Sequence, residues 1–155
     1  MFEIDSSIFV DSLKFETIGG RTVYGGGGIS PDIFVPYDTS GTTFYANALE
    51  WSGVYNQFVF DWAKENKVFK NPPWRSFRDF DTSFVQYELS NKIKRYADQN
   101  FQITPIDQEE FNLSKERIIR RLKSEIARQF WDQDGFYKVF NRNDLDVKAV
   151  LQGFE

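Results

Sequence analysis

The sequence of 155 residues contains no cysteine and no histidine. Without cysteine, the chain can form no disulfide, no thiolate nucleophile and no cysteine-bound metal site. Without histidine, the common zinc sites, the Ser-His-Asp triad and the most frequent general base are excluded as well. The remaining options for catalysis are carboxylate chemistry or a nucleophile assisted by lysine. The third option is that the chain catalyses nothing. We therefore expect no cofactor and no structural metal.

Long apolar runs and an excess of basic charge are also missing. No segment is apolar enough to span a bilayer. The formal net charge is −4, which gives no electrostatic support for a nucleic-acid partner. The N-terminal stretch lacks the basic start and apolar core of a signal peptide, so the signal of an exported natural protein would lie outside this sequence.

The N-terminal part has a β pattern. Apolar and polar residues alternate through SLKFET (12–17), which is typical of a half-buried strand. Gly19 and Gly20 predict a two-residue hairpin turn, with RTVY (21–24) as the returning strand. DIFVP (32–36) predicts a third strand. Because three short strands are few for an independent sheet, we expect them to join a larger sheet, to pair edge to edge in a homodimer, or to stay extended.

The helical pattern begins after Asp38, and a loop with Pro72 and Pro73 interrupts it. Apolar residues recur every three or four positions, as on the buried face of an amphipathic helix. Such stripes lie in GVYNQFVFDWAKEN (53–66) with Val54, Phe58 and Trp62, in SFVQYELSNKIKRYADQN (83–100) with Val85, Leu89 and Ile93, and in SKERIIRRLKSEIARQFW (114–131) with Ile118, Leu122, Ile126 and Phe130. Before them, TSGTTFYANALEW (39–51) offers a capping Ser or Thr and predicts a short helix that ends near Trp51. Asn143 or Asp144 predicts the start of a last helix, which ends near Gly153.

One helix start is well signalled. Asp107 predicts an N-cap, Glu110 completes a capping box, and Ile106 and Phe111 occupy the positions of a hydrophobic staple. All these patterns predict an α+β fold that is mainly α. A short N-terminal β-hairpin and strand segment (1–36) would precede a C-terminal domain (37–155), a bundle of about five helices.

Four consecutive glycines stand in VYGGGGISPDIFVP (23–36). A phosphate-binding P-loop needs Lys and then Ser or Thr after its last glycine, whereas Ile29, Ser30 and Pro31 follow here. A dinucleotide fingerprint would have a third glycine where Ser30 stands, and a helix after it. Both nucleotide-binding readings therefore fail. The interpretation of this stretch as a mobile surface turn is still possible.

The longer stretch GRTVYGGGGISPDIFVP (20–36) resembles the segment G-R-x-(V/I)-x-G-G-G-I-x-P-D-(I/V), which follows the catalytic core of C-terminal processing, or tail-specific, serine proteases. It is most similar to their exported branch in Bacteroidetes, and residues 126–144 and 147–155 resemble the end of the helical region that follows there. The residues that match the motif are Arg21, Gly25, Gly26, Gly27, Gly28, Ile29, Pro31 and Asp32.

The resemblance implies a parent enzyme that cuts peptide bonds with a Ser nucleophile and a Lys general base, on a core joined to a PDZ domain. Both catalytic residues precede the glycine motif in the family, where this chain has a single lysine, Lys14, which matches neither. No catalytic residue is therefore assigned. The chain resembles the non-catalytic C-terminal region of such a protease, exported to the periplasm or cell envelope, with scaffolding, dimerisation or control of substrate access as its role.

The partners implied are the catalytic core and PDZ domain of the same protease, polypeptide substrates through that parent, and a second copy in a homodimer. The alternative is an independent protein- or glycan-binding module without enzymatic activity. The motif loop would be structural or would line a groove: glycines allow sharp turns and close backbone approach, Pro31 extends Ser30, and Asp32 accepts backbone N–H groups.

Some other features have competing interpretations. WDQDGFY (131–137) resembles part of a calcium loop, but its ligands are out of register, so we expect a turn between helices at Asp134 and Gly135. Asp79 and Asp81 are a candidate carboxylate pair, although helix capping accounts better for Asp81.

Basic and aromatic residues also have two interpretations each. A basic cluster predicts a solvated helix face, with a carboxylate-binding patch as the alternative. Its members are Lys115, Arg117, Arg120, Arg121 and Lys123. Four tryptophans, Trp51, Trp62, Trp74 and Trp131, could stack on sugars. Trp62 and Trp131 fit the core better, and Trp74 is the candidate for an exposed stacking residue.

Overall fold

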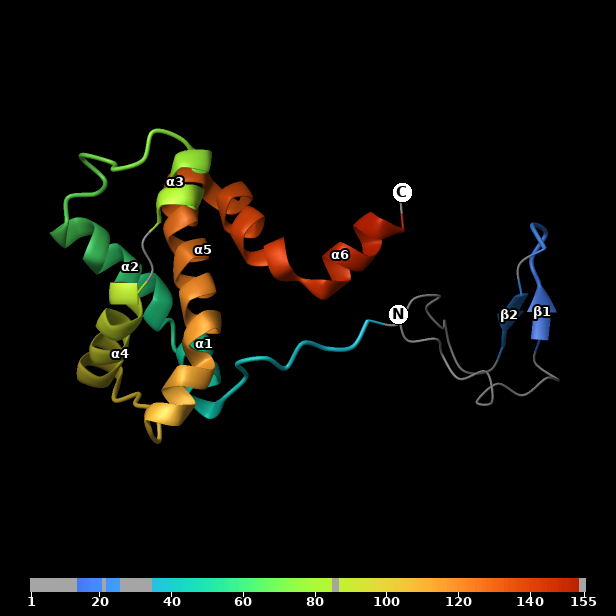
Figure 1. The fold of residues 1–155 in the computed structure, drawn as a ribbon, viewed down its shortest axis with the longest axis horizontal. Coiled ribbons are helices and arrows are strands. Elements are labelled where there is room, and N and C mark those ends of the chain that lie inside the picture. Colours follow the sequence, from blue (N-terminus) through green and yellow to red (C-terminus); the bar gives the residue numbers. More distant parts are fainter. Residues whose placement is uncertain (1–13, 21, 26–34, 85–86, 154–155) are drawn as a thin grey trace. The chain divides into compact units, whose positions relative to one another are not determined.

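A computed structural model describes residues 14–20, 22–25, 35–84 and 87–153 (Figure 1). These residues form one antiparallel β pair and six α-helices, which confirms the mainly α, α+β class. The elements are β1 (Lys14–Glu16), β2 (Thr22–Tyr24), α1 (Phe44–Trp51), α2 (Val54–Glu65), α3 (Phe77–Ser83), α4 (Tyr87–Phe101), α5 (Gln108–Phe140), the 3-10 turn η3 (Asn141–Asn143) and α6 (Leu145–Gln152). The short helix α3 lies where the sequence predicted only a loop.

The expected hairpin is present, but its turn is longer than two residues. Lys14 pairs with Tyr24 and Glu16 with Thr22, so residues 17–21 separate the strands. The side chain of Phe15 is 57% exposed, so the expected half-burial of β1 is wrong. Of the third expected strand, residues 32–34 lie outside the described part, and residues 35 and 36 are not in a strand.

The chain divides into two compact units, residues 39–144 and the remainder (1–38 with 145–155). In the helical unit, α5 packs against α1, α2, α3 and α4. The expected stripe of Ile118, Leu122 and Ile126 is buried and forms the centre of the core with side chains of α1, α2 and α4. None of the helices within the described ranges is both long and apolar enough to cross a membrane.

The first turn of α5 has the expected N-cap but a different use of its glutamate. Asp107 accepts a hydrogen bond from the Glu110 N–H at 2.8 Å. The Glu110 carboxylate accepts from the backbone N–H of Ile106 at 2.7 Å and of Tyr45, in α1, at 3.0 Å. Glu110 therefore ties α5 to α1. The expected hydrophobic staple between Ile106 and Phe111 is wrong, because Ile106 is 81% exposed while Phe111 is buried.

A kink divides α5 into a first limb (108–130) and a returning limb (133–143, including η3). Trp131 (φ −135, ψ 24) and Asp132 (φ 50, ψ −151) are not helical, and Figure 1 shows α5 change direction beside α3. The turn expected at Asp134 and Gly135 is therefore wrong: the break comes earlier. Gly135 lies inside the returning limb, where a Cβ atom would meet the carbonyl oxygen of Ala127 at 2.8 Å. Close helix approach, not turning, requires this glycine.

Candidate functional site

Most residues of the glycine motif lie outside the described part of the chain. They are Arg21, Gly26, Gly27, Gly28, Ile29, Pro31 and Asp32. Gly25 is described: it directly follows β2, has no regular secondary structure and is partly buried. The structural or groove-lining role of the motif therefore stays a prediction, and the best-defined polar sites are in the helical unit.

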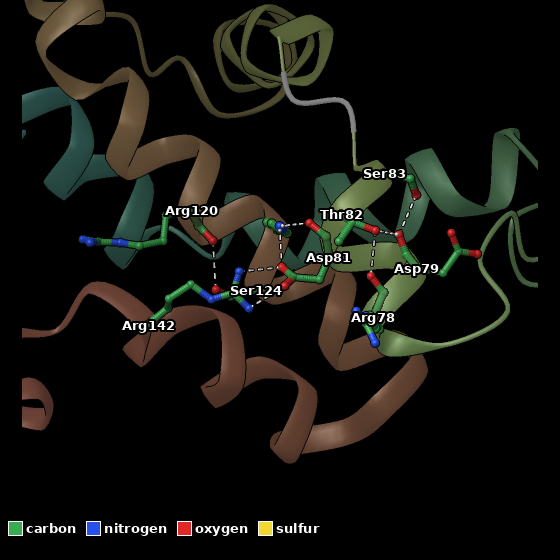
Figure 2. Close-up of polar contacts among 9 residues, drawn as sticks. Arg78, Asp79, Asp81, Thr82, Ser83, Arg120, Ser124 and Arg142 are labelled. Carbon is green, nitrogen blue, oxygen red and sulfur yellow. Dashed lines mark hydrogen bonds and ion pairs between the residues drawn. The ribbon is translucent and has the colours of Figure 1, made fainter. Parts of the chain in front are cut away.

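The Asp81 cluster consists of Asp81, Lys123 and Arg142. The Lys123 ammonium donates to Asp81 Oδ1 at 2.7 Å and to its backbone oxygen at 2.8 Å. The Arg142 guanidinium contacts both carboxylate oxygens at 2.7 Å. Figure 2 shows Arg142 reaching across to Asp81. One carboxylate thus connects α3 to the first limb of α5 and to η3, so the expected helix-capping role of Asp81 is wrong.

The electrostatics of this cluster favour the ionised forms of Asp81 and Arg142. The hydrogen bond from Arg142 lowers the pKa of Asp81 below its usual value; burial opposes this, and Lys123 assists it. The same hydrogen bond raises the pKa of Arg142. The Lys123 side chain is only 10% exposed, so a solvated helix face is the wrong interpretation for it. A cation so deeply placed needs a partner such as Asp81.

A serine next to this lysine raises the question of a Ser-Lys catalytic pair. Ser124 is fully buried and donates to the backbone oxygen of Arg120 at 2.8 Å, as Figure 2 shows. The Lys123 ammonium is bound to Asp81. A nucleophile and its base must be within hydrogen-bond reach of each other and of a substrate. The hydroxyl and the ammonium here are both committed to structural hydrogen bonds.

Asp79, the other member of the expected carboxylate pair, has a local role at the start of α3. Its carboxylate accepts from the Arg75 N–H at 3.0 Å, and its own N–H donates to the capping hydroxyl of Ser76 at 3.2 Å. Asp79 and Asp81 are therefore bound to different partners.

A second polar group, the Glu125 cluster, is buried in the first limb of α5. Glu125 is fully buried, with Arg121 at 3.0 Å and Arg128 at 3.5 Å, and Glu50 lies 3.1 Å from Arg121. The Nε atoms of the two arginines are buried and not aligned for hydrogen bonds. Their guanidinium carbons lie 5.0 Å (Arg121) and 4.1 Å (Arg128) from the ring centre of Phe136, so cation–π contacts add to the charge attraction.

Burial determines the behaviour of Glu125. It raises the pKa of this carboxyl, and the adjacent Arg121 and Arg128 counteract the increase. Two cations and two carboxylates balance one another within the Glu125 cluster. The cluster therefore fastens Phe136, in the returning limb, to the first limb, and it holds no uncompensated charge for a ligand.

Three of the four tryptophans pack against the core of the helical unit, whereas Trp51 is 88% exposed. Trp74 is partly buried and packs edge-on against Phe80, with ring centres 4.7 Å apart, and against Phe130 at 5.7 Å. The expectation of an exposed stacking residue is thus wrong for Trp74. Trp62 and Trp131 also pack against the core, which confirms the prediction for both.

An open, mainly apolar groove of about 280 Å³ lies where α1 and α5 begin. Its walls are formed by Thr43, Phe44, Ile106, Asp107, Glu109, Glu110 and Leu113. Phe44 and Leu113 are 84% and 62% exposed. Thr43 joins the two helices, because its hydroxyl lies 2.6 Å from that of Ser114 and also accepts from the Ala46 N–H.

Metal binding finds no support in the described ranges, where no three Asp or Glu side chains converge on a common centre. In comparisons with known proteins, the model of a family of unknown function (DUF8443) matches residues 45–132, from α1 to the kink in α5. No curated protein and no solved structure matches the chain.

Proposed function

This chain belongs to the family of unknown function DUF8443, and from its own residues we propose that it is a non-catalytic domain of an exported serine endopeptidase of the C-terminal processing type. In this proposal the domain follows the catalytic core and PDZ domain of the parent protein. Its role is to scaffold the enzyme, to dimerise it or to shape access of polypeptide substrates.

The observation that carries the proposal is the motif in GRTVYGGGGISPDIFVP (20–36), with its four glycines and the Pro31-Asp32 pair. A similar motif, with three consecutive glycines in place of four, follows the protease core in the family it resembles. The hairpin formed by β1 and β2 is consistent with this placement, because two short strands are marginal alone and gain stability within a larger sheet.

The chemistry of the helical unit supports a non-catalytic role. Perturbed pKa values often mark active sites, but those of Asp81 and Glu125 arise from ion pairs and burial that fasten helices together. Ser124 and Lys123 are occupied by internal hydrogen bonds. In the alternative, a protein-binding module, the exposed Phe44 and Leu113 at the open α1–α5 groove would be the contact residues.

The gene upstream of Met1 distinguishes the two proposals. The protease proposal expects a reading frame that continues upstream into a core with a serine and a lysine of the family type. It also expects the isolated chain to leave casein and other unfolded proteins uncut. A reading frame without such a core would favour the binding module. Turnover by the isolated chain would contradict both proposals.

A further inference from the structure

The kink in α5 contains a residue whose backbone conformation is rare for any residue other than glycine. Asp132 has φ 50 and ψ −151, a region occupied almost entirely by glycine. The helix is regular on both sides of Trp131 and Asp132. Straightening these two residues would therefore relieve strain and produce one continuous helix. Over its 33 residues such a helix would be about 50 Å long.

The returning limb is held by contacts that do not depend on the kink itself. Arg142 binds Asp81 in α3, and Phe136 packs on the guanidinium groups of Arg121 and Arg128. The same atoms would make the same contacts if the limb came from another molecule. The match to the DUF8443 family ends at residue 132, so the limb lies beyond the matched region.

An open monomer would leave a large apolar surface uncovered. Phe136 and Val139 in the limb are 4% and 5% exposed, and Val139 belongs to the main core. Lifting the limb would expose these side chains and leave the carboxylate of Asp81 without Arg142. A second copy of the chain supplies a surface that fits the limb, because it carries the identical docking site.

We propose that Trp131 and Asp132 form a hinge, and that its straightening lets the returning limb dock on a second copy, giving a limb-swapped dimer. Each copy then contributes Arg142 to Asp81 of the other, and Phe136 to the arginines of the other. The exchange replaces each contact of the returning limb by its equivalent and removes the strain at Asp132, while Trp131, which packs against Phe77 and Phe80, repacks as the hinge straightens.

Two substitutions at the hinge move the equilibrium in opposite directions. Asp132→Gly accepts the kinked conformation and favours the closed monomer, whereas Asp132→Ala favours the continuous helix and the dimer. We expect the association constant for dimerisation, measured by analytical ultracentrifugation, to be at least about tenfold larger for Asp132→Ala than for Asp132→Gly.

Gln129 gives the matched control, because it is exposed and helical in the same helix. Gln129→Gly and Gln129→Ala should differ little in dimerisation, since residue 129 is helical in both states. Equal dimerisation constants for the two Asp132 variants would overturn the proposal, as would a difference of the same size between the two Gln129 variants.

A charge exchange distinguishes limb swapping from ordinary dimerisation. Asp81→Arg and Arg142→Asp each replace the ion pair within one chain by two like charges. In a mixture of the two variants, a limb-swapped heterodimer pairs Arg142 with Asp81 at one site and the two introduced residues at the other. We expect the mixture to dimerise more strongly than either variant alone. A mixture that dimerises no more than the separate variants would contradict the swap, and the Asp132 pair decides the matter if either charge variant fails to fold.

Discussion

Arg142 holds Asp81 with both terminal guanidinium nitrogens, each 2.7 Å from a carboxylate oxygen, although the two residues are 61 positions apart in the sequence. Lys123 binds the same carboxylate from the first limb of α5. A single acidic side chain thus joins three helical segments of the residue 39–144 unit. Its removal should affect stability far more than the removal of an ion pair at the surface.

Substitution of Asp81 by asparagine tests this role. The change keeps the size of the side chain but leaves the Lys123 ammonium, which is 10% exposed, without its counter-charge. We expect the free energy of unfolding to fall by about 2–3 kcal/mol. Asp134→Asn is the control, because its pair with Lys138 is largely exposed and should contribute less than about 0.5 kcal/mol. Equal losses in urea denaturation would contradict the central role of Asp81.

The same carboxylate should contribute to acid sensitivity. The pKa of Asp81 is lower in the folded chain than its usual value. Its stabilising contribution is therefore complete above the usual pKa of an aspartate, about 4, and is lost as the pH falls through the lower folded value. We expect the unfolding free energy of Asp81→Asn to fall less than that of the natural chain between about pH 4 and pH 2. Parallel pH profiles of the two proteins would show that the ion pairs add no net stability.

Gly135 provides a test of the packing between the two limbs of α5. An added methyl group would lie 2.8 Å from the Ala127 carbonyl oxygen and 2.7 Å from the Cβ of Trp131. We expect Gly135→Ala to lower the unfolding free energy by about 1–3 kcal/mol, although alanine is the better helix former. Gly153→Ala is the control, because its nearest neighbour would be 3.4 Å away. Stabilisation by Gly135→Ala would mean that the limbs do not approach as closely as described.

The side chain of Thr43 should contribute more to the stability of the fold than that of Thr42. Its hydroxyl caps α1 and contacts the buried Ser114 hydroxyl, whereas Thr42 accepts one longer hydrogen bond from Arg117 at 3.3 Å. We expect Thr43→Ala to cost about 1–2 kcal/mol of unfolding free energy and Thr42→Ala less than about 0.5 kcal/mol. Thermal or chemical denaturation of both variants measures the difference. A larger loss for Thr42→Ala would show that the joint between α1 and α5 does not depend on this cap.

The predictions from the sequence succeeded where the signal is local. The stripe of Ile118, Leu122 and Ile126 and the N-cap Asp107 could be recognised because each depends on residues within one or two helical turns. The partners of Asp81 are 42 and 61 residues away, so its sequence neighbours allowed only the interpretation as a cap.

The turn expected at Asp134 and Gly135 was misplaced for a physical reason, because the helix breaks at Trp131 and Asp132. Neither kink residue, Trp131 nor Asp132, is a glycine or a proline, which are the usual signals of a helix break. Gly135 gives such a signal, but the chain uses it for close approach between the limbs. Trp74 follows two prolines and was expected at the surface, yet it is partly buried and packs against Phe80 and Phe130. For the glycine motif, Gly25 alone is among the described residues, and its role stays a prediction.

Labelling of the natural protein tests the proposed function most directly. An antibody raised against residues 39–144 would isolate the natural polypeptide from its cells, and a fluorophosphonate probe would then mark any activated serine, which peptide mass spectrometry locates. We expect one labelled serine on a peptide from outside this sequence, in a polypeptide much larger than 18.2 kDa. A natural polypeptide without a labelled serine, or with the label on a serine of this chain, would contradict it.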